Sequence, residues 1–333
     1  MNLMNYTIRN LAVLISILMG LSLASFGYLN RALPEEIKPA DLSCLAENDG
    51  VFLDESIQYK NIYGIGLSYA NHINETASNY NRNVGPPVFE KALISLTKNG
   101  SNVAMPSQQQ LLQSVESVER GAISTLENSE INLSVLLDYE VELAFVLLED
   151  ITHEQLNRVD FIPKLGFFIA NDLSARSIAI LGEGRANRFD YWGASKSFNG
   201  FTPISSGIWV ANNRPLGGIP CVELKTYVNQ ELRQSEYTHN LIYRPIEMLR
   251  AILNNYPNRN LGKGDMVLTG TPGGVIFNVP RWKVRAANFL GFDRFKKLSF
   301  AQKGSSADKF LKVGDRIRVR GGWLGEANTN IVN

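Results

Sequence analysis

Acidic residues alternate along one short stretch of this sequence. Asp138, Glu140 and Glu142 stand two positions apart in LLDYEVELAFVLLED. In an extended strand this spacing places side chains on one face, so the three carboxylates are predicted to converge. Like charges that close repel one another and raise a pKa unless a cation lies between them. The pattern thus indicates a metal site, although a charged edge strand that discourages aggregation explains it equally well.

Another carboxylate, Asp172, follows the apolar run LGFFIA. The end of a buried strand is a common place for a functional group, whereas capping of the next segment is the structural alternative. Carboxylates with no His or Cys cluster beside them suit a hard cation. We therefore expect Mg²⁺ or Mn²⁺, with Ca²⁺ also compatible and Zn²⁺ disfavoured.

The elements that must position these carboxylates are mostly short and rich in β-branched residues. Strands are predicted at 62–67, 135–148, 164–170, 208–210, 222–228, 266–270 and 316–319. Helices are predicted at 108–115, 153–158 and 246–254, and YVNQELR at 227–233 reads as a hairpin around an Asn-Gln turn. This content favours an α+β, mainly β domain over a doubly wound sheet. No glycine-rich nucleotide-binding motif occurs in the sequence.

The composition is that of a globular protein without a polyanion partner. Hydrophobic residues make up 44% of the 333 residues, enough for a sizeable core. Lys and Arg total 33 against 32 Asp and Glu, so nucleic-acid binding is not expected. Cys44 and Cys221 show no metal-binding spacing, which excludes a zinc finger and a disulfide-rich scaffold but leaves one disulfide open.

The N-terminal region is unusually apolar. No charge occurs between Arg9 and Arg31, and residues 11–29 are long enough as a helix to cross the roughly 30 Å core of a bilayer. Ser22 and Ala24 are also spaced for signal cleavage. The sequence therefore predicts either a single N-terminal membrane anchor or an exported protein whose signal is removed.

The expected domain organisation follows from this segment. Residues 1–32 form the anchor or signal, 33–60 a connector, and 61–333 the catalytic domain. Within that domain, residues 280–309 mix basic and aromatic side chains. This insertion is expected either to lie on a membrane surface or to be solvated.

Several motifs, taken in order, resemble the fumarylacetoacetate hydrolase family, and the acylpyruvate hydrolase branch looks nearest. The resemblance runs from Ile62 to about Val279 and resumes from Phe310 to Gly325. It is carried by YANHINE at 69–75, PPVFEK at 86–91, DYEVEL at 138–143, NDLSAR at 171–176, SKSFNGFTPIS at 195–205 and GDMVLTGTPGGV at 264–275. The family fold that it implies is a mixed β-sandwich or roll.

The resemblance implies a metal held by Glu140, Glu142 and Asp172, which agrees with the pattern of acids described above. It also implies that His72 and Glu75 activate a water molecule. Their three-residue spacing puts both on one face of a helical turn, where the carboxylate can hold the imidazole in its proton-accepting tautomer.

Four further residues receive roles from the same resemblance. Lys196 is similar to a family lysine that faces the metal-bound substrate and would stabilise negative charge on oxygen. Lys91 and Thr271 would bind the substrate carboxylate. Arg176 would either touch the substrate or brace Asp172. Apart from the resemblance, Lys196 fits a solvated lysine in a loop, and Thr271 fits a tight turn that needs Gly270 and Pro272.

The activity implied is hydrolysis of a carbon–carbon bond in a small 2,4-dioxo acid, by a homodimer. An alternative on the same site is oxaloacetate decarboxylation or keto–enol isomerisation, which needs only the enolate step. An alternative of another class is a membrane-tethered binding protein that has lost catalysis.

Overall fold

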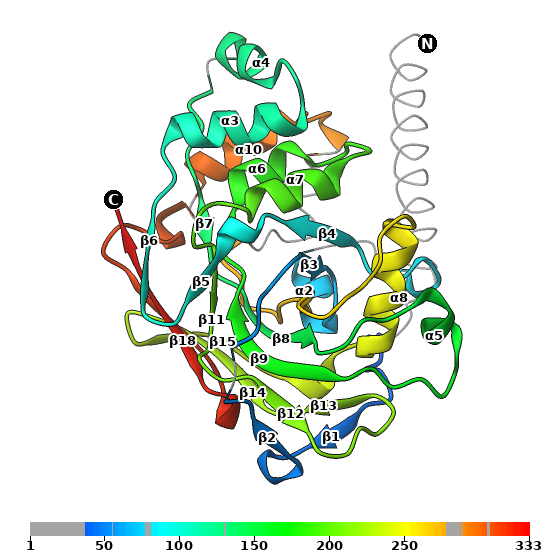
Figure 1. The fold of residues 1–333 in the computed structure, drawn as a ribbon. Helices are drawn as coiled ribbons and strands as arrows, with labels where there is room; N and C mark the ends of the chain where they lie inside the picture. Colours follow the sequence, from blue (N-terminus) through cyan, green and yellow to red (C-terminus); the bar gives the residue numbers. More distant parts are fainter. Residues whose placement is uncertain are drawn as a thin grey trace, which may run out of the picture. The chain divides into compact units, whose positions relative to one another are not determined.

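The computed structural model describes residues 37–54, 56–76, 81–129, 131–277, 287, 289–304 and 307–333. Lys38–Asn333 form one unit by themselves (Figure 1). The connector at 38–60 lies within this unit, since it contributes strands β1 (Ser43–Leu45) and β2 (Gly50–Phe52).

The larger sheet is mixed and carries the acidic residues. Its strands run in the order β2, β12, β9, β8, β16, β3 and β4, with β11 joined to β9 and β5 joined to β11. Here β8 and β9 pair antiparallel, while β16 and β3 pair parallel. The bounds are β12 Trp209–Ala211, β9 Leu165–Asn171, β8 Val141–Leu147, β16 Met266–Leu268, β3 Ile62–Ile65, β4 Val88–Lys91, β11 Thr202–Ile204 and β5 Leu96–Lys98.

A second sheet of five strands is ordered β15, β14, β17, β18 and β6. The hairpin between β14 and β15 turns at Asn229 and Gln230, whose φ angles of 49° and 74° confirm the predicted Asn-Gln turn. The bounds are β15 Glu231–Tyr237, β14 Glu223–Val228, β17 Arg316–Gly321, β18 Glu326–Val332 and β6 Ser101–Ala104. Two short pairs are separate: β1 with β13 (Gly218–Pro220), and β7 (Leu137–Asp138) with β10 (Ser174–Ala175).

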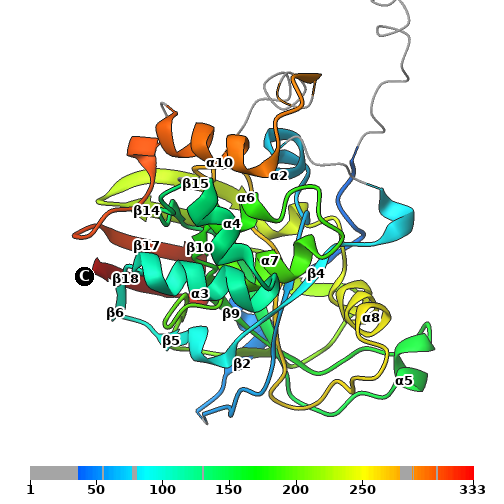
Figure 2. The ribbon, with the colours of Figure 1, turned by 90° about the horizontal axis from the view of Figure 1, so that it is seen from above.

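Helices gather beside the larger sheet. Both views place α3, α4, α6, α7 and α10 together (Figures 1 and 2), and α5 packs against α8. The bounds are α2 Ala70–Glu75, α3 Gln108–Val118, α4 Ala122–Asn128, α5 His153–Asn157, α6 Arg176–Leu181, α7 Arg188–Ser195, α8 Pro245–Asn255 and α10 Arg294–Lys303. Short 3₁₀ turns occupy Glu47–Asp49, Arg82–Val84, Leu93–Ser95, Thr238–Asn240, Ala307–Lys309 and Gly322–Leu324.

The core lies on the central strands of the larger sheet. One cluster of fully buried side chains comprises Ile62, Ala144, Val146, Phe168, Ala170, Met266 and Leu268. Every residue of β8 and β9 is buried, on both faces. The α+β class expected from the sequence is confirmed. The three predicted helices begin and end close to their predicted limits, whereas others, among them α7 and α10, were not predicted.

The strand expected at 135–148 is interrupted. It ends at Asp138 and resumes at Val141, because the Asp138 carboxylate accepts backbone N–H groups from Tyr139, Ile276 and Phe277 at 2.9, 3.0 and 3.2 Å. These bonds turn Asp138 toward the 276–277 loop. Asp138 is therefore not among the three acids whose oxygens lie within 4.8 Å of one another, although Arg176 joins it to Glu140.

The expected membrane anchoring or export also needs correction. No helix among the described residues combines the length and apolar character needed to cross a bilayer. The segment 11–29, on which that localisation rested, lies outside the described residues. The function proposed below rests on the Lys38–Asn333 unit alone.

The described part of the 280–309 insertion contains α10, which packs against α6. Leu298 of this helix is fully buried. Arg294 donates from Nη1 and Nη2 to the two carboxylate oxygens of Glu119, at 2.5 and 2.9 Å, and from Nη1 to the Tyr191 hydroxyl at 3.1 Å. We call Glu119, Tyr191 and Arg294 the brace, because they join α10 to the α3 end and to α7.

Candidate active site

Three carboxylates from two adjacent strands converge in the larger sheet. One oxygen each of Glu140, Glu142 and Asp172 lies within 4.8 Å of the others. Their exposed fractions are 4%, 2% and 0%. We call these three residues the acid cluster. The pairing of separated acids that the sequence predicted is thus present in the fold.

Strand pairing fixes the acid cluster. Asp172 follows β9, and its N–H donates to the Glu140 carbonyl at 2.8 Å. The Glu140 N–H in turn donates to the Asn171 side-chain oxygen at 3.1 Å. Because Glu142 stands opposite Ala170 in the same ladder, all three acids are held by backbone geometry.

A glycine turn supports the third acid. The Gly270 N–H donates to Glu142 Oε2 at 2.7 Å. Gly270 has a φ of 95°, and a Cβ there would lie 2.5 Å from Ser68 Oγ and 2.7 Å from the Ile65 carbonyl oxygen. Only glycine therefore brings this N–H to the carboxylate.

The charges in the cluster are unevenly compensated. Burial alone would raise the pKa of Glu140, but Arg176, Lys196 and His72 outweigh it and lower that pKa to about 2. Burial, followed by repulsion from Asp172 and Glu140, raises the pKa of Glu142 well above its usual value. Within the described residues Glu142 forms no ion pair. Glu142 is therefore the acid of the cluster whose charged form is least favoured in the metal-free protein.

Two buried lysines flank the acid cluster on different sides. Lys196, just after α7, donates to Glu140 Oε2, and at 2.7 Å to both Asp172 Oδ2 and Ser174 Oγ. Burial lowers its pKa, but Asp172 and Glu140 more than offset this, so the ammonium form is favoured. Lys91 at the end of β4 donates to Asp172 Oδ1, and burial lowers its pKa. Lys196 lines the cavity described below, whereas Lys91 lies outside its lining.

Arg176 at the start of α6 joins two acids. Its Nε donates to Asp138 Oδ2 at 2.8 Å and its Nη2 to Glu140 Oε1. The side chain also lines the cavity. Arg176 therefore holds the first acid of the cluster and presents a small exposed part to a ligand.

His72 and Glu75 lie on one face of α2, as their spacing predicted. His72 Nδ1 and Glu75 Oε1 are 3.1 Å apart, with side chains 12% and 16% exposed. The Gly274 N–H lies 2.9 and 3.1 Å from the Glu75 oxygens. Since Nδ1 faces a carboxylate, the favoured tautomer carries its proton there and leaves the Nε2 lone pair free to accept one.

A cavity joins these groups. Its lining includes the acid cluster, His72, Arg176, Lys196 and Thr271, together with apolar side chains from α6, α7 and the 277 region: Ile180, Trp192 and Phe277. The cavity is therefore lined by both charged and apolar side chains. Such a lining suits a small anion that carries an acyl substituent.

Thr271 is held by residues from both sheets. Its hydroxyl donates to the Val141 carbonyl at 3.1 Å and accepts from Gln234 Nε2 at 3.0 Å. Gln234, on β15 of the second sheet, also accepts the Val141 N–H at 3.1 Å. Sequence reasoning overlooked Gln234 and Asn171. The only local signal for Gln234 is its place as the one buried residue of β15.

The donor set fits a hard divalent cation. All three candidate ligands are carboxylate oxygens within 4.8 Å of one another, and burial, with repulsion from the other two acids, raises the pKa of Glu142. Oxygen-only ligands suit Mg²⁺ or Mn²⁺ better than Zn²⁺. The residues that would hold the cation are therefore Glu140, Glu142 and Asp172.

Comparison with known proteins gives a family match over most of the chain. Residues 61–332 match the family described as fumarylacetoacetate (FAA) hydrolase C-terminal. Oxaloacetate tautomerase YisK of Bacillus subtilis is 25% identical over 261 residues, 78% of this chain and 65% of that protein. A 4-hydroxyphenylacetate degradation bifunctional isomerase/decarboxylase of Salmonella dublin is 27% identical over 220 residues, 66% of this chain. The chain spans only 42% of the length of that relative.

A further relative and a solved structure extend the match. A protein of Archaeoglobus fulgidus is 31% identical over 144 residues, 43% of this chain and 51% of its own length. The crystal structure of fumarylpyruvate hydrolase from Pseudomonas aeruginosa in complex with Mn²⁺ and pyruvate shares the fold, with a TM-score of 0.54 at 20% identity. That similarity covers 91% of this chain and 99% of the solved one.

Proposed function

The chain belongs to the fumarylacetoacetate hydrolase family, and we propose that it hydrolyses a carbon–carbon bond in a small 2,4-dioxo acid. The observation that carries this proposal is the position of His72, which lines the same cavity as the buried acid cluster. A base and a cation site that face one cavity are what hydrolysis of a chelating oxo acid requires.

The reaction divides into an addition and a cleavage. Water adds to the C4 carbonyl and gives up one proton, forming a tetrahedral alkoxide. The C3–C4 bond then breaks, with its electron pair passing to C3 as an enolate. The proton returns to C3, so the products are a carboxylic acid and pyruvate. No oxidant or other reactant is needed.

His72 is the proposed base in these reaction steps. Glu75 faces Nδ1 and so leaves Nε2 to accept the proton of water and later to return it. Glu75 is itself fixed by the Gly274 N–H, which limits rotation of the pair. General base catalysis of this kind contributes about 10²- to 10⁴-fold in rate.

Positive charge in the same cavity favours the enolate. Lys196 keeps its proton beside Glu140 and Asp172 and can donate to a developing oxyanion. A divalent cation at Glu140, Glu142 and Asp172 would, when bound, act as a Lewis acid on the 2-oxo group.

Three residues complete the proposed site. Thr271 offers its backbone N–H to the substrate carboxylate, because its hydroxyl proton is already donated to the Val141 carbonyl. Arg176 orients Glu140, and its exposed edge lies along the substrate path. Lys91, expected from the resemblance to bind the substrate carboxylate, pairs with Asp172 in this structure, and we propose that it orients that acid.

A second candidate activity uses the same residues without attack by water. Two relatives are named as an oxaloacetate tautomerase and an isomerase/decarboxylase. Enolate formation at the same cavity, with His72 moving a proton, would give keto–enol tautomerisation or decarboxylation of oxaloacetate. The inactive binding-protein reading fits less well, because every residue that the proposed reaction needs is present.

Parallel assays separate these candidates. We would measure acetylpyruvate cleavage, oxaloacetate decarboxylation and oxaloacetate enolisation by the full chain with Mg²⁺ and with Mn²⁺. The proposal predicts metal-dependent acetylpyruvate cleavage at the highest kcat/KM. Turnover of oxaloacetate alone would favour the second candidate, and no turnover of any 2-oxo acid would contradict both.

We also propose a homodimer, on family membership alone. Sedimentation velocity of the full chain would show one species of twice the chain mass if this is so. A single species of 37.1 kDa would contradict it.

A further inference from the structure

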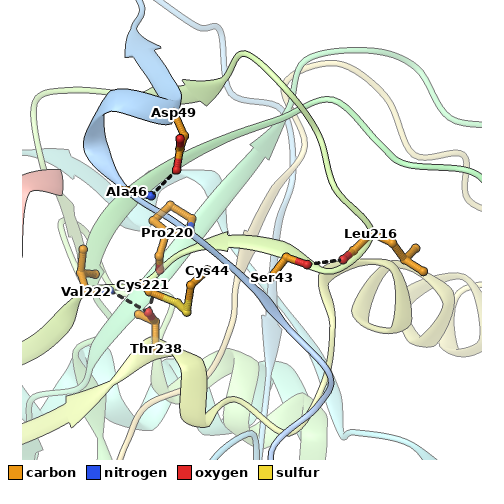
Figure 3. Close-up of a disulfide and its surroundings, with 9 residues drawn as sticks. All are labelled: Ser43, Cys44, Ala46, Asp49, Leu216, Pro220, Cys221, Val222 and Thr238. Carbon is orange, nitrogen blue, oxygen red and sulfur yellow. Dashed lines mark hydrogen bonds between the residues drawn. A yellow bond between two sulfur atoms is a disulfide. The ribbon is translucent and has the colours of Figure 1, made fainter.

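A second group of metal-binding atoms lies away from the active site. Cys44 of β1 and Cys221, which follows β13, form a disulfide across 177 positions of sequence (Figure 3). The two sulfur atoms and a ring nitrogen of His239 lie within 4.8 Å of one another. His239 and Cys44 are exposed and Cys221 is partly exposed. Two sulfurs and an imidazole are therefore close together and accessible to solvent.

Backbone pairing holds the two cysteines together independently of their covalent bond. β1 and β13 pair in parallel, with Cys44 opposite Ile219. The Cys221 N–H donates to the Leu45 carbonyl at 3.1 Å, and Ser43 Oγ donates to the Leu216 carbonyl at 3.1 Å (Figure 3). Their Cα atoms are 5.1 Å apart. Reduction would therefore leave two thiols on neighbouring, hydrogen-bonded segments.

His239 is fixed beside them by the preceding residue. The buried Thr238 hydroxyl donates to the Pro220 carbonyl at 2.7 Å and accepts the Val222 N–H at 3.0 Å (Figure 3). These bonds hold the residue before the histidine to both sides of Cys221. The His239 ring stacks on Tyr237, with ring centroids 5.3 Å apart, which further limits its rotation.

We propose that reduction of this disulfide creates a zinc site whose ligands are Cys44, Cys221 and His239. A small thiol breaks the sulfur–sulfur bond: two thiol molecules are oxidised to their disulfide while the two protein sulfurs are reduced to thiols. Zn²⁺ then displaces one proton from each protein thiol and binds both thiolates and the imidazole. Water takes the fourth position.

The ligand chemistry selects zinc over the cation expected at the acid cluster. Thiolate and imidazole are soft or borderline donors that suit Zn²⁺, whereas Mg²⁺ and Ca²⁺ prefer oxygen. Two thiolates also neutralise the charge of the ion. The consequence is structural: the 38–60 connector stays linked to the rest of the unit whether the cysteines are oxidised or reduced.

Cobalt titration of the full chain tests this site directly. The protein is reduced anaerobically with a phosphine, freed of reductant, kept in excess Mg²⁺ and titrated with Co²⁺ while the sulfur-to-cobalt charge-transfer band is recorded. The reduced protein should bind one equivalent of Co²⁺ and develop the charge-transfer band. Added Zn²⁺ should displace the Co²⁺ and abolish the band. The oxidised protein should show no such band.

Matched variants decide whether the histidine is a ligand. His239→Gln should weaken Co²⁺ binding by at least about tenfold, since even loss of an outer-shell partner costs that much. His153→Gln, at an exposed histidine on α5, should bind like the wild type. Disulfide formation in oxidised His239→Gln checks that this variant folds. The proposal is overturned if reduced wild type shows no band, or if both histidine variants bind equally.

Discussion

The acid cluster and the brace are both ionic groups within one domain, but their charges are compensated differently. In the brace a single carboxylate, Glu119, meets Arg294 through both oxygens, and Arg185 approaches at 3.2 Å. The pKa of Glu119 is lowered to about 2, chiefly by the hydrogen bonds from Arg294. In the acid cluster the pKa of Glu142 is raised. The single acid of the brace is paired with arginine, whereas Glu142 of the cluster has no ion-pair partner among the described residues.

This difference separates a structural ion pair from a binding site. A paired carboxylate stabilises the fold and gains nothing from a further cation. A carboxylate that is buried beside two others destabilises the fold until a cation arrives. Replacing an acid of the cluster should therefore stabilise the metal-free fold and lower activity. Replacing a residue of the brace should destabilise the fold and leave activity nearly unchanged.

The largest expected effect is on turnover by Glu142→Gln. We expect kcat/KM to fall by about 10⁴-fold or more, because substrate positioning and charge stabilisation are lost together. The metal-free variant should nevertheless be more stable than the wild type, since one repelling charge is gone. Steady-state kinetics and urea unfolding would check both. A loss of activity with a loss of stability would contradict the comparison.

The next effect is that of His72→Ala. Turnover should fall by about 10²- to 10⁴-fold through loss of the base, while Mn²⁺ affinity changes little. The control is His153→Ala, which alters an exposed histidine on α5 outside the cavity lining. Activity like that of the wild type in His72→Ala would remove His72 from the proposed mechanism.

The pH dependence of stability should differ between the two regions. Because the folded-state pKa of Glu142 lies above its ordinary 4.5, stability of the metal-free protein is lost as pH rises from 4.5 through that raised value. The slope for one proton is at most about 1.4 kcal/mol per pH unit. The lowered pKa of Glu119 acts oppositely, since its stabilisation is lost as pH falls from 4.5 toward 2.

Unfolding of the metal-free protein across pH would check this. Glu142→Gln should flatten the arm above pH 4.5. Glu119→Gln should reduce the slope of the arm below it, to which Glu140, with a pKa also lowered to about 2, contributes as well. If Glu142→Gln left the upper arm unchanged, the charge imbalance assigned to the cluster would be wrong.

The smallest effect is expected from Arg294→Ala. Loss of the charged hydrogen bonds to Glu119 should lower the free energy of unfolding by about 1–2 kcal/mol, with kcat changed little. Arg185→Ala, which removes an exposed partner of the same acid, should cost less than about 1 kcal/mol. If Arg294→Ala and Arg185→Ala lowered the free energy of unfolding equally in chemical denaturation, Arg294 would not be the main partner of Glu119.

Local patterns in the sequence predicted much of this arrangement. The three-residue spacing of His72 and Glu75 placed them on one helical face, and apolar runs located β8 and β9. Contacts between side chains far apart in the sequence could not be predicted from local patterns. Asp138 binds N–H groups near residue 276 and is not one of the acids that converge.

The remaining differences also arise from contacts across the chain. Lys91 binds Asp172 across 81 positions of sequence, a pairing that no local pattern indicates. Cys44 and Cys221 pair because β1 reaches β13, and no local spacing indicates this. A residue's partner is set by the fold whenever the two are far apart in sequence.

Calorimetric titration of the metal-free chain with Mn²⁺ tests the central claim most directly. Wild type should bind one ion at the acid cluster, Glu142→Gln should bind it at least about 100-fold more weakly, and Glu149→Gln, at an exposed acid beyond β8, should match the wild type. Equal binding by all three proteins, or none by the wild type, would contradict a cation site formed by Glu140, Glu142 and Asp172.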